Sequence, residues 1–281
     1  MRMTFALGTS PTHSQIINEI QPPNLLVAFP YAKALDTIIY KPEYVMTDSG
    51  AFSAWNVGKK VDIRAYADWA LSQQAKFPRV VSVNLDVIPG EKGRTSTKQE
   101  RLDGMRQSLK NADYLRAAGL NVMEVFHQDE PKEFLFELLD RLPENAILGI
   151  SPRNDKHLKA KIDWQKVVLA AIKEKCGIDN FPRTHGLAVT SVEMLREFPY
   201  YSGDSSTWVN PWRYGGYVDE RGRIVGIDTK MSKRPTSKES TDALHFFARE
   251  SIYNLMRVGD SMTTLWATRG IDWKEENVKA K

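Results

Sequence analysis

Short apolar segments with the length of β-strands alternate with amphipathic, helix-like segments along the whole sequence. Such alternation predicts a mostly parallel sheet that is covered by helices. No Pro-, Gly- or Ser-rich linker divides the strand candidates, so the sequence favours a single (β/α)8 TIM-type barrel over a doubly wound sheet. Neither a Gly-x-Gly-x-x-Gly motif after the first strand nor a Gly-Lys-Ser/Thr phosphate loop is present. The strand candidates cover residues 1–8, 25–29, 44–47, 80–85, 121–126, 146–150, 184–189 and 200–206.

The helix candidates carry typical start and stop signals. Asp62 is placed to cap a helix, and Gly119 follows a long helix in the usual C′ position. The last strong helix is expected to run from Ser237 to Arg257, with Gly259 behind it. We therefore interpret residues 1–281 as one α/β domain, with residues 274–281 as a frayed, charged tail.

Composition excludes several classes of protein. Cys176 is the only cysteine, which excludes an intramolecular disulfide and any multi-cysteine zinc site. No apolar run approaches the roughly 20 residues that span a bilayer, and the first apolar run is too short for a signal peptide. The expected location is the cytoplasm, that of the host if a phage encodes the chain. A net charge of +4 is compatible with a polyanionic partner without requiring one.

Polar residues follow the strand candidates, and three of them are aspartates: Asp48, Asp86 and Asp204. In a barrel the carboxyl ends of the strands meet at one mouth, where active sites lie. We therefore expect the three carboxylates to converge there. The same mouth should receive His127 and Gln128, Ser151, Arg153 and Asn154, and Gly186 and Leu187.

Two other interpretations of these aspartates exist. Each one is also a common turn residue that bonds to its own backbone. Three carboxylates could instead bind a divalent metal. No His-x-His pair accompanies them at metal-site spacing, and His13, His157 and His245 are interpreted as surface or packing residues.

Paired carboxylates suit chemistry at a glycosidic carbon. One attacks or stabilises the oxocarbenium-like centre, and the other handles the proton of the leaving group. A third carboxylate can accept hydrogen bonds from a bound base, and Gly186 would let a planar ligand approach the backbone. Phe52, Tyr201 and Trp208 are candidates to stack on such a ring.

Two motifs resemble a known family. The segment Thr-Asp-Ser-Gly-Ala-Phe at 47–52 resembles the Thr-Asp-Ser-Gly-Gly-Phe motif of the tRNA-guanine transglycosylases. The segment His-Gly-Leu-Ala-Val at 185–189 resembles their Gly-Gly-Leu-Ala-Val-Gly segment, and the order of the three aspartates matches that family. Residues 201–208 resemble the short form in the phage and bacterial branch that inserts 7-deazaguanine bases into DNA (the DpdA type). The resemblance covers roughly Tyr44 to Gly215.

The resemblance implies a TIM barrel that exchanges a guanine in DNA for a free 7-deazaguanine base, such as preQ0, through a covalent enzyme–nucleotide intermediate. Asp204 would be the nucleophile and Asp48 the proton-transfer group. Asp86 would bind the base edge, assisted by Gln128 and by the backbone of Gly186 and Leu187. No cofactor is implied.

The sequence departs from the tRNA enzymes in two places. Those enzymes hold a structural zinc with three cysteines and a histidine, which a chain with Cys176 alone cannot do. This favours DNA over tRNA as the substrate and a barrel without the zinc-binding subdomain. In addition, Gly-Gly has become His185-Gly186 and a following glycine has become Thr190, so we expect an altered pocket wall.

A nucleic-acid substrate requires cationic contacts to phosphate. The candidates are Arg153, Arg213, Lys230, Lys233 and Arg234, each of which can also be an ordinary solvated charge. Three other functions remain open: a zinc-free tRNA-guanine transglycosylase, a nucleoside or glycoside hydrolase on the same barrel, and a barrel that only binds nucleic acid. The sequence does not determine the oligomeric state.

Overall fold

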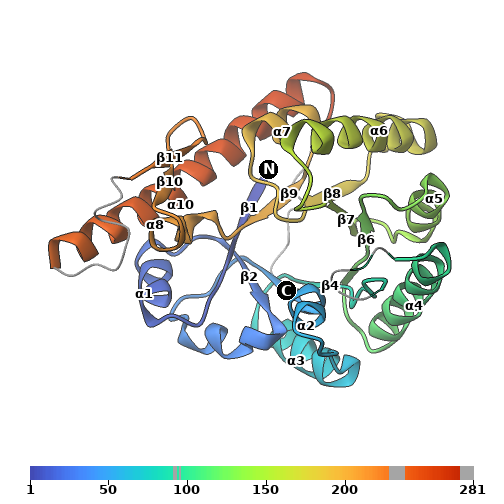
Figure 1. The fold of residues 1–281 in the computed structure, drawn as a ribbon, viewed down its shortest axis with the longest axis horizontal. Coiled ribbons are helices and arrows are strands. Elements are labelled where there is room, and N and C mark those ends of the chain that lie inside the picture. The colour runs from blue at the N-terminus through green and yellow to red at the C-terminus, as the bar shows by residue number, and fades with distance from the viewer. Residues whose placement is uncertain (91–93, 95, 228–237, 273–281) are drawn as a thin grey trace.

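The computed structural model, which describes residues 1–90, 94, 96–227 and 238–272, has nine parallel strands in one curved sheet surrounded by helices (Figure 1). The order of the strands is β5-β4-β3-β2-β1-β9-β8-β7-β6. Their bounds are β1 Arg2–Ala6, β2 Asn24–Ala28, β3 Tyr44–Asp48, β4 Val80–Val83, β5 Val122–Met123, β6 Val125–His127, β7 Ile147–Ser151, β8 Arg183–Gly186 and β9 Ser202–Ser205.

The two strands at the ends of this order, β5 and β6, are separated along the chain by Glu124 alone. Strand β5 pairs with β4, whereas β6 pairs with β7. Backbone hydrogen bonds continue across the break, because Asn84 N donates to Met123 O at 2.9 Å and Gly149 N donates to Glu124 O at 2.8 Å. One interrupted strand therefore closes the sheet, and the barrel has eight strand positions. The predicted TIM-type barrel is confirmed.

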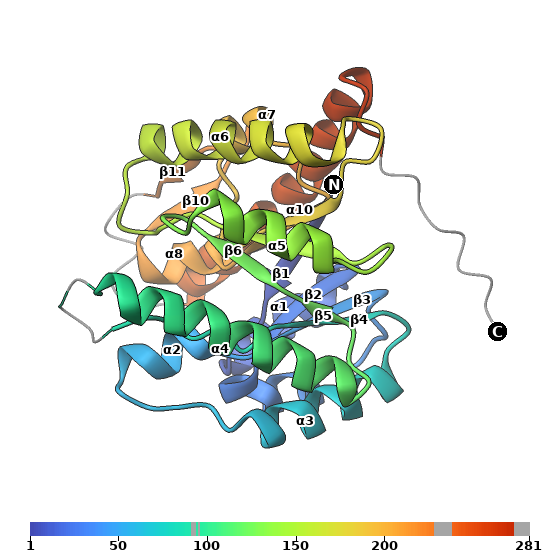
Figure 2. The same ribbon diagram turned by 90° about the vertical axis from the view of Figure 1, so that its right-hand side faces the viewer.

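The helices cover the outside of the barrel (Figure 2). Helices α4, α5 and α6 lie side by side, and ion pairs join them: Arg141 to Asp113 between α5 and α4, and Lys132 to Glu174 between α5 and α6. A short antiparallel hairpin, β10 Gly216–Val218 and β11 Ile224–Gly226, packs on the last helix. The helices are α1 Pro11–Ile20, η1 Phe29–Thr37, α2 Ala51–Asn56, α3 Ile63–Lys76, α4 Lys98–Ala117, α5 Lys132–Arg141, α6 Leu158–Cys176, α7 Val192–Glu197, η2 Thr207–Val209, α8 Asn210–Arg213 and α10 Lys238–Thr268.

The predicted helix signals are confirmed at two ends. The Asp62 side chain accepts hydrogen bonds from the backbone of Arg64 and Ala65 at the start of α3, and Gly119 follows α4 with φ of 98°. The predicted end of the last helix is wrong, since α10 continues through Gly259 to Thr268. A side chain at position 259 would lie 2.8 Å from the backbone oxygen of Met1. Glycine therefore serves there for close packing of α10 against β1, and it does not end the helix.

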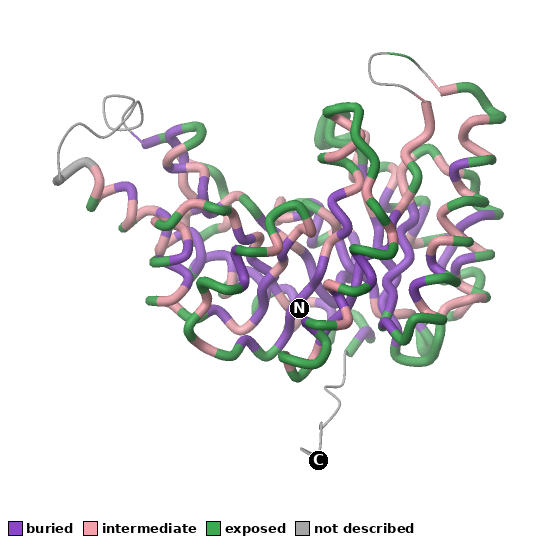
Figure 3. Tube along the Cα trace, turned by 90° about the horizontal axis from the view of Figure 1, so that it is seen from below, coloured by how far each residue is buried: buried purple, intermediate pink, exposed green. Residues whose placement is uncertain are grey.

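The barrel interior and the helix layer form separate apolar clusters. Buried residues follow the strands, and exposed residues gather on the outer helices and loops (Figure 3). The interior cluster includes Tyr44 and Met46 of β3 and Met123 and Val125 of β5 and β6. Because alternate residues of a strand share one face, Asp48 and His127 continue these inward rows to the carboxyl end of the barrel.

Within the described ranges, no helix is long and apolar enough to cross a membrane. The predicted tail, residues 274–281, lies outside the described residues.

Candidate active site

The three strand-end aspartates meet at the mouth of the barrel. Asp48 ends β3, Asp86 lies three residues after β4, and Asp204 lies within β9. Burial and, to a lesser extent, the negative charges of Asp204 and Asp86 together raise the pKa of Asp48 to about 6, against the lowering effect of hydrogen bonds from the backbone of Gly50 and Ser49. The predicted convergence of the three carboxylates is thus present in the structure.

The segment around Asp48 is fixed by its neighbours. Gly50 has φ of 72°, and a side chain there would lie 2.5 Å from Pro30 Cδ, so both conformation and space require glycine. The Ser49 hydroxyl donates to Asn84 O at 3.1 Å, and Tyr66 Oη donates to Thr47 O at 3.0 Å. These bonds hold the Asp48 turn against β4 and α3, which places its carboxylate with little freedom.

Asp86 belongs to a polar cluster with a histidine. Its carboxylate accepts a hydrogen bond from Asn84 Nδ2 at 2.9 Å and lies 3.1 Å from His127 Nε2. The backbone N–H of His127 donates to Glu130 Oε2 at 2.7 Å. Burial by itself would lower the pKa of His127, but the hydrogen bond to Asp86 and the charges of Glu130 and Asp86 outweigh it and raise this pKa to about 9.

His127 is therefore an imidazolium at neutral pH, paired with Asp86. Burial also raises the pKa of Glu130 to about 7, with the His127 charge opposing that shift. The sequence placed His127 at the mouth because it ends a strand, but no sequence signal showed its pairing with Asp86, which lies 41 positions earlier. The role of Glu130 was missed.

Asp204 is held from two sides. The backbone N–H of Ala188 donates to its Oδ1 at 2.7 Å, and His185 Nε2 lies 3.3 Å from the same oxygen. The other ring nitrogen of His185 lies 2.8 Å from Ser202 Oγ. His185 and Ser202 are directly paired in the register of β8 and β9, and both are fully buried. Ala188 reaches Asp204 from a left-handed conformation, with φ of 55°.

The neighbouring predicted base-binding residues lie at the same end of the barrel. The Gln128 side-chain oxygen accepts from Arg153 N at 3.0 Å. Leu187 packs on the interior cluster. A side chain on Gly186 would meet Val189 Cβ at 2.8 Å and Tyr200 at 3.0 Å, so packing accounts for this glycine. Base binding by Gln128, Gly186 and Leu187 stays a prediction.

Of the three aromatic candidates, one is exposed beside the Asp48 turn. Phe52 of α2 is 57% exposed and stacks on Trp55 with ring centroids 6.2 Å apart. The other two expectations are wrong. Tyr201 precedes β9 and lines a cavity with Arg2 at the opposite end of the barrel, and Trp208 is completely buried in the helix-layer core.

The predicted cationic residues differ in their surroundings. Both Asp129 and Asp155 contact the Arg153 guanidinium, at 2.7 and 2.5 Å, and these hydrogen bonds raise the pKa of the arginine. Arg213 ends α8 and is exposed. The remaining three candidates, Lys230, Lys233 and Arg234, lie outside the described residues.

The other three histidines are packing or surface residues, as predicted, and the exposed His157 also caps a helix. His13 makes an edge contact with Trp208, with ring centroids 5.1 Å apart, and burial lowers its pKa. His157 caps α6 by accepting from Ala160 N at 3.0 Å, and His245 packs on Trp212.

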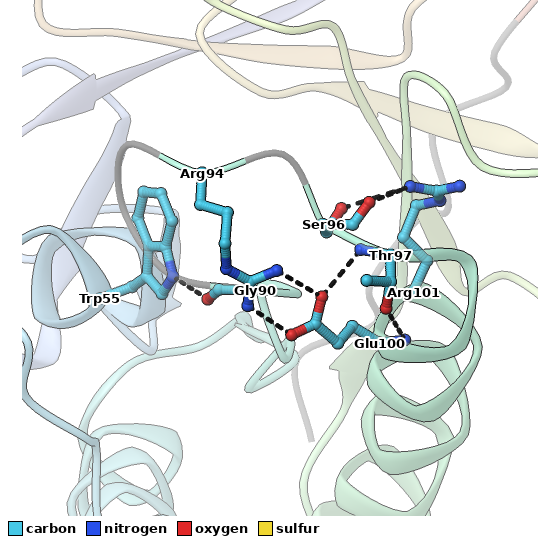
Figure 4. A network of polar contacts seen from close by, with 7 residues as sticks. All are labelled: Trp55, Gly90, Arg94, Ser96, Thr97, Glu100 and Arg101. Carbon is cyan, nitrogen blue, oxygen red and sulfur yellow. Dashed lines mark hydrogen bonds and ion pairs between the residues drawn. The ribbon is translucent and has the colours of Figure 1, made fainter.

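The loop after Asp86 is tied to two helices (Figure 4). Trp55 of α2 donates from Nε1 to Gly90 O at 3.0 Å, and Arg94 binds both carboxylate oxygens of Glu100 at the start of α4. Glu100 and Thr97 also form a reciprocal capping box. The described residues Gly90 and Arg94, which lie between β4 and α4, are thereby tied to α2 and to α4.

Among the described residues, no group of three or more His, Cys, Asp or Glu side chains has an arrangement that could hold a metal ion. A scan against protein-family models found no match, and a search of curated proteins found none either. The resemblance to the transglycosylases therefore rests on the two motifs and on the order of the aspartates.

Proposed function

We propose that this protein is a DNA guanine transglycosylase, which exchanges guanine in DNA for a free 7-deazaguanine base such as preQ0. The observation that carries the proposal is the meeting of Asp48, Asp86 and Asp204 at one barrel mouth, where burial, assisted by the charges of Asp204 and Asp86, raises the pKa of Asp48 to about 6. Carboxylates whose environments give them different protonation behaviour suit separate acid and nucleophile roles.

In the proposed reaction, an Asp204 oxygen attacks C1′ of the target deoxyguanosine. The bond between C1′ and N9 breaks, its electron pair goes to the base, and the protonated carboxyl of Asp48 supplies the proton, so that neutral guanine leaves. The incoming base then gives its N9 proton to the Asp48 carboxylate and attacks C1′, which releases Asp204. Protons balance over the cycle, and no other reactant is needed.

The contacts of Asp204 suit a nucleophile. The Ala188 N–H and His185 both approach Oδ1, which leaves the second oxygen for attack. A neutral His185 that donates from Nε2 accepts from the Ser202 hydroxyl at Nδ1, so both ring nitrogens are satisfied. We assign His185 as a positioning residue for Asp204, a role that the family's glycine at this place would not supply.

The contacts of Asp86 suit recognition of a base. A carboxylate has about four acceptor positions, and Asn84 and His127 occupy two of them. The remaining positions can accept N–H donors from the edge of a guanine or deazaguanine. A target base within duplex DNA must be flipped out to reach it.

The test is incorporation of radiolabelled preQ0 and guanine into double-stranded DNA and into total tRNA, in parallel reactions. The proposal expects label in DNA, lost in Asp204→Asn and kept in Asp68→Asn, a matched change on the exposed face of α3. Label in tRNA alone would establish the zinc-free tRNA enzyme instead. Release of guanine without any added base would indicate a hydrolase, and binding of DNA with neither reaction would indicate a non-enzymatic barrel.

A further inference from the structure

The amino-terminal end of the barrel, opposite the candidate active site, contains a cavity of about 560 Å³. Residues that begin the strands line it, among them Arg2 of β1, Tyr44 of β3 and Arg183 of β8. Its volume lies within the roughly 300–1,000 Å³ that is typical of small-molecule sites. The cavity is therefore large enough for a ligand of several heavy atoms.

The charged residues among the described lining of this cavity are all basic. Arg2, Arg79 and Arg183 reach it from three different segments, and none of the described residues that line it is Asp or Glu. Two of the guanidiniums lie against the Tyr201 ring, since Arg2 Cζ lies 5.2 Å and Arg183 Cζ 5.0 Å from its centroid. Such a concentration of positive charge favours an anion.

A buried hydroxyl provides a second, independent observation. Tyr44 lines the same cavity and is 3% exposed, and the described part of the chain offers its Oη no hydrogen-bond partner. Leaving a buried hydroxyl without a hydrogen-bond partner is unfavourable. An oxygen of a bound ligand would satisfy it.

We propose that this cavity binds a small molecule that bears one or two phosphate groups. Guanidinium groups bind phosphate oxygens in bidentate fashion, and each carries five N–H donors, so an arginine that already holds one partner can still bind a ligand. Three such groups and a phenol match the several oxygens of a phosphate better than the two of a single carboxylate. The site is separate from the proposed base exchange and does not depend on it.

Calorimetric titration of the full-length protein with inorganic phosphate and with pyrophosphate, at constant ionic strength, tests the proposal. We expect saturable 1:1 binding that is about tenfold weaker in Arg183→Gln and several-fold weaker in Tyr44→Phe, which removes only the hydroxyl. Arg106→Gln is the control, because it removes the same charge from the exposed side of α4.

Absence of saturable binding would overturn the proposal, as would equal binding by Tyr44→Phe and the wild type. An equal loss in Arg106→Gln would also overturn it, since that residue lies in α4, outside the cavity lining. If Arg183→Gln does not fold, Tyr44→Phe decides the question, because it keeps the ring against which Arg2 lies.

Discussion

The two ends of the barrel carry opposite chemistry on the same strands. Strand β3 begins with Tyr44 at the arginine-rich cavity and ends with Asp48 at the acidic mouth. The chain segment of β9 likewise passes from Tyr201 to Asp204 within four residues. In β3 the inward residues therefore change from a phenol to a carboxylate, with the buried Met46 between them.

The partners at the two ends also differ in kind. At the mouth, Asp204 is held by a backbone N–H group and by His185, and Asp86 is held by His127; these contacts set the orientation of the carboxylates. At the other end, the polar groups are cations against aromatic rings, together with an unsatisfied hydroxyl. The difference agrees with the two proposals, in which the mouth carries out proton transfer and nucleophilic attack and the other end binds an anion.

The largest expected effect is at Asp204. We predict that Asp204→Asn lowers base exchange by at least about a thousandfold and abolishes the covalent adduct, because an amide oxygen is a poor nucleophile. Asp86→Asn should instead raise KM for the incoming base and leave the adduct detectable. Mass spectrometry of protein denatured during turnover checks both. An adduct on Asp86, surviving in Asp204→Asn, would reverse the two assignments.

A smaller loss is expected at His185. His185→Gln should lower kcat by about tenfold to a hundredfold with little change in KM, because a misplaced nucleophile affects the chemical step more than binding. Ser202→Ala, which removes only the bond to Nδ1, should act in the same direction but more weakly. His245→Gln on α10 is the matched control. A rise in KM alone would show that His185 shapes the base pocket rather than positioning Asp204.

The raised pKa of Asp48 has a consequence for stability. Its folded value of about 6 exceeds the ordinary value of 3.8, so the fold favours the protonated form, and stability falls as pH rises from about 4 to about 6. Two pKa units correspond to about 3 kcal/mol. We predict that Asp48→Asn gains stability relative to the wild type over that interval, in urea unfolding at several pH values. A difference independent of pH would contradict the raised pKa.

The sequence was sufficient to predict the barrel and the location of the three aspartates at its mouth. Each aspartate follows or ends an apolar strand, and the carboxyl ends of parallel strands must meet, so local pattern and topology together determine the result. The sequence predicted one strand where the structure has β5 and β6, separated by Glu124. The alternation of apolar residues continues without a break from one side of Glu124 to the other, so the sequence pattern gave no sign of the interruption.

The features of the site that could not be predicted from the sequence depend on contacts between strands. The contacts of Asp86 with His127 and of Asp204 with His185 join strands whose relative register has no local signal. The expectation for Tyr201 was wrong because a residue just before a strand lies at the opposite end from a residue just after it. The interpretation of Gly259 as a helix end was wrong because the sequence alone does not distinguish a glycine that ends a helix from a glycine that permits close packing.

The smallest expected effect is a change in titration at the mouth. The pKa of His127 is raised to about 9, so the imidazole should titrate in NMR spectra far above the ordinary histidine value of 6.5. The substitution Asp86→Asn should lower this pKa, because it removes a hydrogen bond to a carboxylate. The pairing stabilises the fold at low pH, and this contribution is lost as pH rises through about 9. Because the imidazole is 37% exposed, solvent screening should keep the stability change small. Titration of His127 near 6.5 in the wild type would mean that Asp86 does not raise the pKa of the imidazole, and would contradict the pairing of these two side chains.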